Sequence, residues 1–275
     1  MNAYGRLMRM DKPVGTALLW APTGWALWLA NHGAPSVSLV FYFFLGTVLM
    51  RAAGCVVNDM VDRSIDKQVK RTRLRPLASG ELRSIQALCV LAGLLGLAGL
   101  IALQLPRACW LEACIALGIT CLYPFAKRWL QAPQLMLGLA FSMGIPMAYT
   151  ASGAVFDPTM VLLCVLNFLW ILAYDTLYAL MDQEDDLRIG VHSTAILFCS
   201  HLPKIMVLLQ IGFHGLWLYL GMTRVVSEWF DVCWVVGVGI LNYQHTLLQK
   251  QTVDAYLQAF WWHAGYGLLM WIALL

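Results

Sequence analysis

Two stretches of the sequence carry polar oxygen atoms at helical spacing. The first contains Asn58, Asp62 and Asp66, each four residues from the next, with Asp59 beside Asn58. Residues four apart share one face of a helix, so these side chains would form a single stripe. Carboxylates on one face repel each other unless a cation neutralises them, and Mg²⁺ binds through a few carboxylates together with substrate phosphates. The stretch therefore predicts a magnesium site.

The second stretch ends a long apolar run. Asp175, Tyr178 and Asp182 recur at positions i, i+3 and i+7, and Asp186 follows four residues later beside Asp185. Asp175 lies deepest in the apolar sequence, where an ionised carboxylate is costly and usually functional. One acidic helix end is often only a solvated loop. Two such ends that face the same side favour a shared site.

Basic residues accompany both stretches, as expected for a site that binds phosphate. They are Lys70, Arg71, Arg73 and Arg75, and also Lys127 and Arg128, which follow Tyr123 at the end of another apolar segment. Guanidinium groups match phosphate oxygens, although membrane topology alone also places bases in such loops. Metal and bases together would stabilise the charge on a departing diphosphate. An allylic prenyl diphosphate suits a membrane location because its tail can lie between helices.

The elements that position these residues are apolar helices. The 275 residues are 60% hydrophobic and 12% charged, against about 25% charged in an ordinary soluble domain. Nine segments are long enough to cross about 30 Å of hydrocarbon. They are 14–31, 36–57, 85–105, 108–124, 134–153, 160–181, 203–222, 229–247 and 256–275. We expect an all-α polytopic membrane protein whose nine transmembrane helices form one domain over residues 1–275.

The loop charges orient this arrangement. With nine spans, all but three of the 18 Lys and Arg residues fall in loops on one face, the exceptions being Arg51 within a span and Arg107 and Arg224 on the other face. The positive-inside rule then places the N-terminus and both acidic stretches in the cytoplasm.

The motifs resemble a known family. The pattern Asn58-Asp59-x-x-Asp62-x-x-x-Asp66, followed by Lys70-Arg71-Thr72-x-x-Arg75-Pro76-Leu77-x-Ser79-Gly80, occurs together with Tyr174-Asp175-x-x-Tyr178-x-x-x-Asp182-x-x-Asp185-Asp186. Together they resemble the UbiA superfamily of intramembrane prenyltransferases. Three further motifs are similar to its 4-hydroxybenzoate polyprenyltransferase branch in bacterial ubiquinone biosynthesis. These are Arg9-Met-Asp-Lys12-Pro13-x-Gly15, Tyr123-Pro124-Phe-x-Lys127-Arg128 and Ile189-Gly190-x-x-Ser193-Thr194. Ala78 departs from the family pattern, which commonly has proline there.

The resemblance implies a central cavity with a lateral opening for the prenyl chain and a cytoplasmic cap, in a protein of the bacterial inner membrane. It implies that Asn58, Asp62 and Asp66 hold one Mg²⁺ and that Asp182 and Asp186 hold another, with Asp59 and Asp185 as further candidate ligands. Lys127, Arg128 and Arg75 would contact diphosphate oxygens, Lys127 and Arg128 as catalytic residues. Arg71 is a further candidate substrate contact. The expected partners are polyprenyl diphosphate, 4-hydroxybenzoate and membrane lipid, with no nucleic acid.

The resemblance also implies how the acceptor reacts. An allylic carbocation would attack the ring carbon ortho to the phenol, and Asp175 would orient the phenol or help to remove its proton. Arg51 is the candidate partner for the acceptor carboxylate, the alternatives being an internal salt bridge or snorkelling. Tyr123 and Tyr178 are candidate substrate contacts.

Three other functions are compatible with parts of the pattern. An ion-coupled transporter also has membrane carboxylates, but near the bilayer midplane at broken helices. A CDP-alcohol phosphotransferase uses spaced aspartates with metal, but needs no second acidic stretch. Within the family, the acceptor could be homogentisate, a naphthoate or haem.

Overall fold

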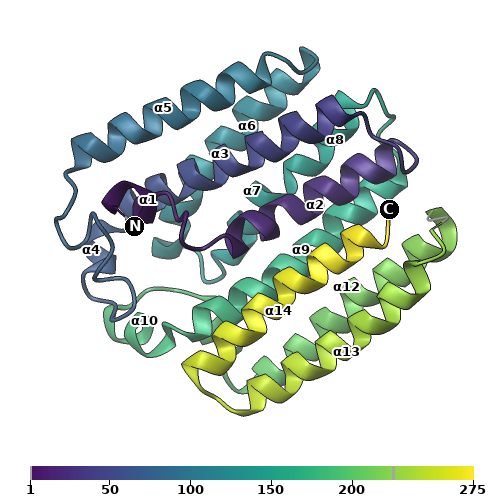
Figure 1. Ribbon diagram of the computed structural model, residues 1–275. Helices are drawn as coiled ribbons and strands as arrows, with labels where there is room; N and C mark the ends of the chain where they lie inside the picture. Colours follow the sequence, from purple (N-terminus) through teal and green to yellow (C-terminus); the bar gives the residue numbers. More distant parts are fainter. Residues whose placement is uncertain (1, 225–226) are drawn as a thin grey trace.

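The computed structural model describes residues 2–224 and 227–275, and every regular element in them is a helix (Figure 1). The long helices run side by side. They are α2 (Val14–Ala30), α3 (Val37–Val61), α5 (Ser84–Ala102), α6 (Ala108–Leu122), α9 (Pro158–Leu180), α12 (Leu202–Arg224), α13 (Phe230–Gln249) and α14 (Val253–Ile272). Each lies within a few residues of a range predicted from the sequence.

The predicted range 134–153 is divided into two shorter helices, α7 (Gln134–Ser142) and α8 (Gly144–Ala151). Five helical segments of the described chain are long and apolar enough to cross a membrane. They are Val37–Val61, Ser84–Ala102, Ala108–Arg128, Pro158–Leu180 and Thr194–Arg224. The α2 helix is shorter, and α13 and α14 contain more polar side chains. The nine spans expected from the sequence therefore stay a prediction, beside five that length and composition support.

Short helices gather at one end of the bundle. Figure 1 places α1 (Ala3–Leu7), α4 (Arg63–Asp66) and α10 (Gln183–Ile189) together at the end where α3 and α9 finish. The remaining short elements are η1 (Tyr123–Arg128), α11 (Thr194–Phe198) and η2 (Cys199–His201). Both acidic stretches thus lie where a long helix gives way to a short one.

Each acidic stretch is broken at an aspartate. Asp62 separates α3 from α4, and Asp182, with φ −112° and ψ 3°, separates α9 from α10. The continuous stripe that the spacing predicted is therefore wrong in detail, because Asp66 and Asp186 stand on separate short helices. The three acids in the first turn of α10 favour this local arrangement, since they complement the positive end of the helix dipole.

Aromatic side chains fill the centre of the bundle between α2, α9, α12 and α14. The rings of Trp25 and Trp217 meet edge to face, with their centroids 5.0 Å apart, and Trp170 lies 5.1 Å from Trp25. Trp25 Nε1 donates a 3.0 Å hydrogen bond to the Gly267 carbonyl. A Cβ on Gly267 would lie 2.5 Å from the Trp170 ring, so glycine permits this close approach. The packing fixes α9, which carries Asp175 and Tyr178.

Candidate active site

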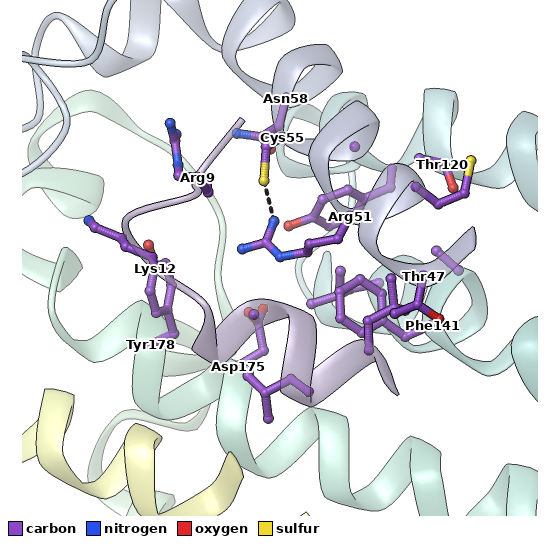
Figure 2. A pocket seen from close by; sticks show the side chains of 18 of the residues that line it. Arg9, Lys12, Thr47, Arg51, Cys55, Asn58, Thr120, Phe141, Asp175 and Tyr178 are labelled. Atoms are coloured by element: carbon purple, nitrogen blue, oxygen red, sulfur yellow. Dashed lines mark hydrogen bonds between the residues drawn. The ribbon is translucent and has the colours of Figure 1, made fainter. Parts of the chain in front are cut away.

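A cavity of about 1120 Å³ extends from the short helices into the bundle. Most of its lining is apolar and comes from α2, α3, α5, α6, α7 and α14, and charged side chains gather at one end. We call that cluster the polar end; it consists of Arg9, Asn58, Asp59, Asp66, Arg71, Arg75, Lys127, Tyr178, Asp182 and Asp186. The inner region begins one to two helical turns before Asn58 on α3, where Figure 2 shows Arg51 and Cys55, with Asp175 opposite. Gln134 and Tyr174, which also line the cavity, complete it.

On the α3 side of the polar end, two aspartates pair with two arginines. Arg9 Nη2 lies 2.6 Å from Asp59 Oδ1, and Arg75 Nη1 lies 3.2 Å from the same oxygen. Arg75 Nη1 also lies 2.9 Å from Asp66 Oδ2. Burial raises the pKa of Asp66, while the positive charge of Arg75 opposes that rise. Arg75 therefore links the end of α3 to α4.

Asp62 and Lys127 form a second ion pair, with Nζ 2.7 Å from Oδ2. Asp62 is fully buried and is not part of the cavity lining, whereas Lys127 is. Arg128 turns the other way, because Nη2 donates to the carbonyl of Val61 at 3.0 Å and the guanidinium lies over the Phe125 ring. Arg128 is therefore outside the lining and contacts the end of α3.

On the α9 side, Arg71 joins the loop after α4 to the second acidic stretch. Its Nε donates to Asp182 Oδ1 at 2.8 Å, Nη2 pairs with Asp182 Oδ2, and Nη1 donates to the Tyr178 hydroxyl at 2.5 Å. Asp185 faces away from the cavity and accepts hydrogen bonds from the Lys70 amide at 2.7 Å and from Arg188 at 2.9 Å. These contacts hold the loop against α10.

Asp186 lines the cavity beside these pairs. Burial and the negative charge of neighbouring Asp182 raise the pKa of Asp186 to about 7. The positive charges of Lys127 and Arg71 lower this pKa, but burial and Asp182 outweigh them, and a bound cation would further favour the ionised carboxylate.

The donor set at the polar end fits a hard divalent cation. Among residues 2–224 and 227–275, no group of three or more acids, histidines or cysteines is arranged to hold an ion as it stands. Two carboxylate oxygens, Asp59 Oδ2 and Asp62 Oδ1, are nevertheless buried without a hydrogen-bond partner in the described structure. A buried oxygen atom without a hydrogen-bond partner is costly, and oxygen ligands are what Mg²⁺ prefers. The residues therefore match the predicted magnesium site in chemistry, although present partners must be exchanged to assemble it.

In the inner region, Arg51 has no acidic partner. Nη1 donates to the Cys55 thiol, Nε is buried without a partner, and no carboxylate among the described residues lies within ion-pair distance. Figure 2 shows its guanidinium and the Asp175 carboxyl pointing into the same part of the cavity. The internal salt bridge considered as an alternative role for Arg51 is therefore absent among residues 2–224 and 227–275. An unpaired guanidinium can bind an anion.

Sequence reasoning gave no role in the site to Arg9, Gln134 or Tyr174, which line the cavity. Arg9, quoted in a family motif and as a loop charge, pairs with Asp59. Gln134 is buried at the start of α7 and accepts the Thr194 amide hydrogen bond at 3.2 Å. The Tyr174 hydroxyl is buried without a partner among the described atoms. A polar residue that begins an apolar segment directly after Pro133 was the one available signal for Gln134.

Apolar helices around a cavity with acids and bases at one end define an integral membrane protein that can bind an amphipathic, anionic ligand. The profile of the UbiA prenyltransferase family matches residues 19–272, and the chain belongs to that family.

Relatives and solved structures agree with this placement. The chain is 50% identical to a 4-hydroxybenzoate octaprenyltransferase of Legionella pneumophila strain Paris, over 99% of this chain and 96% of the relative. It is 44% identical to a protein of the same name from Pseudoalteromonas translucida, over 99% and 93% of the two chains. The apo structure of a UbiA homolog from Aeropyrum pernix K1 superposes with a TM-score of 0.80 at 18% identity, covering 94% and 96% of the two chains. A UbiA homolog from Archaeoglobus fulgidus bound to GPP and Mg2+ gives a TM-score of 0.72 at 16% identity, covering 98% and 99%.

Proposed function

We propose that the chain transfers a polyprenyl group from polyprenyl diphosphate to the ring of 4-hydroxybenzoate, ortho to the hydroxyl, and releases diphosphate in ubiquinone biosynthesis. The observation that carries the proposal is one cavity that joins the acid and base cluster of the polar end to the unpaired Arg51. Two anionic groups, a diphosphate and a benzoate, would then bind at two places along an apolar channel. Relatives that share 50% and 44% of their residues with this chain, both named 4-hydroxybenzoate octaprenyltransferase, support the choice of substrates.

The proposal includes a topology. The chain forms a single domain over residues 1–275, with nine spans in the bacterial inner membrane and its N-terminus in the cytoplasm. The short helices at one end of the bundle form a cytoplasmic cap over the polar end. The concentration of Lys and Arg in loops on that side supports this orientation. A lateral opening would admit the prenyl tail from the lipid.

The metal is Mg²⁺, which would neutralise diphosphate and stabilise the charge of the leaving group. Asn58, Asp62 and Asp66 would hold one ion, and Asp182 and Asp186 another. Asp59 lies beside the first set. Asp185 would act by holding the loop through the Lys70 amide, since it faces away from the cavity. The Mg2+ in the Archaeoglobus fulgidus homolog supports the identity of the ion.

The bases at the polar end hold the diphosphate. Lys127, Arg71 and Arg75 line the cavity and now pair with carboxylates. Each would exchange a carboxylate oxygen for a phosphate oxygen when the donor binds. The Tyr178 hydroxyl, which accepts a hydrogen bond from Arg71, helps to orient that guanidinium. Arg128 would support this arrangement from outside the cavity through the end of α3.

The inner region orients the acceptor. Arg51 binds the carboxylate, while Asp175 accepts a hydrogen bond from the phenol and increases electron density on the ring. When the allylic C–O bond breaks, the electron pair leaves with diphosphate and the ring carbon bonds to the allylic carbon. The released diphosphate then accepts the ring proton, which restores aromaticity. Tyr123 and Tyr174 lie beside this position and exclude water.

The test is to incubate membranes containing the protein with a polyprenyl diphosphate, Mg²⁺ and a panel of labelled aromatic acids. We expect 4-hydroxybenzoate to acquire a lipid tail. Prenylation of homogentisate or a naphthoate in its place would change the acceptor but keep the family activity. No lipid product with any acceptor would refute the proposal.

A further inference from the structure

Gly15 and Cys55 lie on either side of the Arg51 guanidinium. We propose that these two residues form a seat that fixes Arg51 and so set a preference for acceptors carrying a carboxylate. The inference rests on the proposed function, in which Arg51 binds the acceptor carboxylate. All three residues line the cavity.

Gly15 leaves room for the guanidinium. A Cβ built on Gly15 would lie 2.6 Å from Arg51 Cζ and closer still to Nε and Nη2. Real Cβ atoms essentially never approach other heavy atoms within 3.0 Å, so any larger residue at position 15 would displace Arg51. The clash involves only the guanidinium, the part of Arg51 that would contact a ligand.

Backbone conformation gives no reason for glycine at position 15. Gly15 is the second residue of α2, and it is not among the glycines with positive φ. Glycine generally lowers helix stability relative to alanine, because its backbone loses more conformational freedom on folding. The space required by Arg51 is the feature of the described structure that offsets this cost.

Cys55 holds the other side. It follows Arg51 by four residues on α3, it is buried, and its Sγ accepts a hydrogen bond from Nη1. A thiol is a weak and uncharged acceptor. It can therefore orient the guanidinium without neutralising its charge, whereas a carboxylate at position 55 would form a salt bridge and compete with the acceptor.

The seat orients the Arg51 guanidinium without occupying the charge that would bind the ligand. Arg51 is held by one backbone surface on α2 and one neutral side chain on α3, and it keeps its charge for a ligand. A shift of the guanidinium would weaken a charge-assisted, directional contact with a carboxylate. It would have little effect on an acceptor that has no carboxylate.

The experiment compares kcat/KM for 4-hydroxybenzoate with kcat/KM for its neutral analogue 4-hydroxybenzamide. We expect Gly15→Ala to lower the ratio of these values about tenfold or more, as for loss of a hydrogen bond to a charged group. The KM for polyprenyl diphosphate and turnover of the amide should stay within about twofold, because the polar end is unchanged. Gly239→Ala is the matched control, since it is also a helical glycine but has open space around it.

A second pair of variants tests the seat without altering Gly15, in case Gly15→Ala does not accumulate in membranes. Cys55→Val keeps the size but removes the acceptor, and should lower the ratio about threefold to tenfold. Cys55→Ser retains an acceptor and should keep the ratio near that of the wild type.

Several results would overturn the inference. Equal losses with both acceptors in Gly15→Ala would show a purely structural role, and an unchanged ratio in Gly15→Ala and Cys55→Val would show that the seat does not control selectivity. A wild-type enzyme that prenylates both acceptors equally would refute the role of Arg51 itself. Failure to prenylate any acceptor would instead refute the proposed function, so the two failures are distinguishable.

Discussion

The polar end and the inner region of the cavity differ in how their charges are satisfied. At the polar end, Arg71, Arg75 and Lys127 all pair with carboxylates of the chain itself. In the inner region, Arg51 bonds to the Cys55 thiol and to no carboxylate of the described chain. Removing one partner from a buried ion pair costs about 3–5 kcal/mol, so a ligand at the polar end must replace contacts as it breaks them. A ligand at Arg51 has no ion pair to displace.

This difference indicates which ligand each region of the cavity can bind. Diphosphate with Mg²⁺ supplies both signs of charge, so it can satisfy the bases and the carboxylates that it separates. A single carboxylate cannot do this at the polar end, but it matches the guanidinium of Arg51 in the inner region. The donor and acceptor regions are therefore distinguished by charge balance as well as by position.

Removal of Mg²⁺ should have the largest effect. With a chelator present, we expect transfer to fall below detection, because bases alone would have to bind diphosphate beside uncompensated carboxylates. Binding of labelled 4-hydroxybenzoate should be unchanged, since the proposed metal ligands lie outside the inner region. Transfer that persists in a chelator would show that the polar end needs no metal.

Loss of a single acid among the proposed metal ligands should have the next largest effect. Asp182→Ala and Asp62→Ala should each lower kcat/KM about 100-fold or more, in the range measured for groups that stabilise a developing charge. Asp182→Asn and Asp62→Asn serve as variants of the same size, and gel filtration in detergent checks folding. Retained activity in both alanine variants would sink the proposal of two metal ions.

Arg51→Leu should have an intermediate effect on one substrate. We expect kcat/KM for 4-hydroxybenzoate to fall about 10- to 100-fold, as for loss of a hydrogen bond between charged groups. The KM for polyprenyl diphosphate should not change. A rise in the KM for the diphosphate alone would place Arg51 with the donor and erase the distinction between the two regions.

Arg128→Gln should have the smallest effect. Arg128 lies outside the cavity lining and donates a hydrogen bond to the Val61 carbonyl. We therefore expect kcat/KM to fall about tenfold or less, as for the loss of one hydrogen bond to a neutral acceptor. Arg75→Gln, which alters a base within the lining, is the comparison and should lower kcat/KM further than Arg128→Gln does. A larger loss in Arg128→Gln would restore the direct role in catalysis that the sequence motif predicted.

The lengths and positions of the apolar segments predicted the bounds of the long helices well. The segment 160–181 corresponds to α9 (Pro158–Leu180), where Pro158 at the first helical position and Asp157 at the N-cap fix the start. Of the acids that spacing placed on the two stripes, Asp66, Asp182 and Asp186 line the cavity, whereas Asp62 does not. The bounds of a helix and the spacing along it are properties of single helices, which local sequence determines.

Features that depend on contacts between helices could not be predicted. Helical spacing assumes a straight helix, so it missed the breaks at Asp62 and Asp182. Lys127 and Arg128 are adjacent in a 3₁₀ turn, and only tertiary packing directs one to Asp62 and the other to Val61. The fit of Gly15 around Arg51 likewise needs α2 and α3 in place.

The most direct test of two distinct regions in one cavity is to measure the Michaelis constants for donor and acceptor in wild type, Asp182→Ala and Arg51→Leu. We predict that Asp182→Ala raises only the donor KM, for polyprenyl diphosphate, and that its residual activity needs more Mg²⁺. We predict that Arg51→Leu raises only the acceptor KM, for the hydroxybenzoate. If both variants change the KM for the same substrate, the division of the cavity into donor and acceptor regions is wrong.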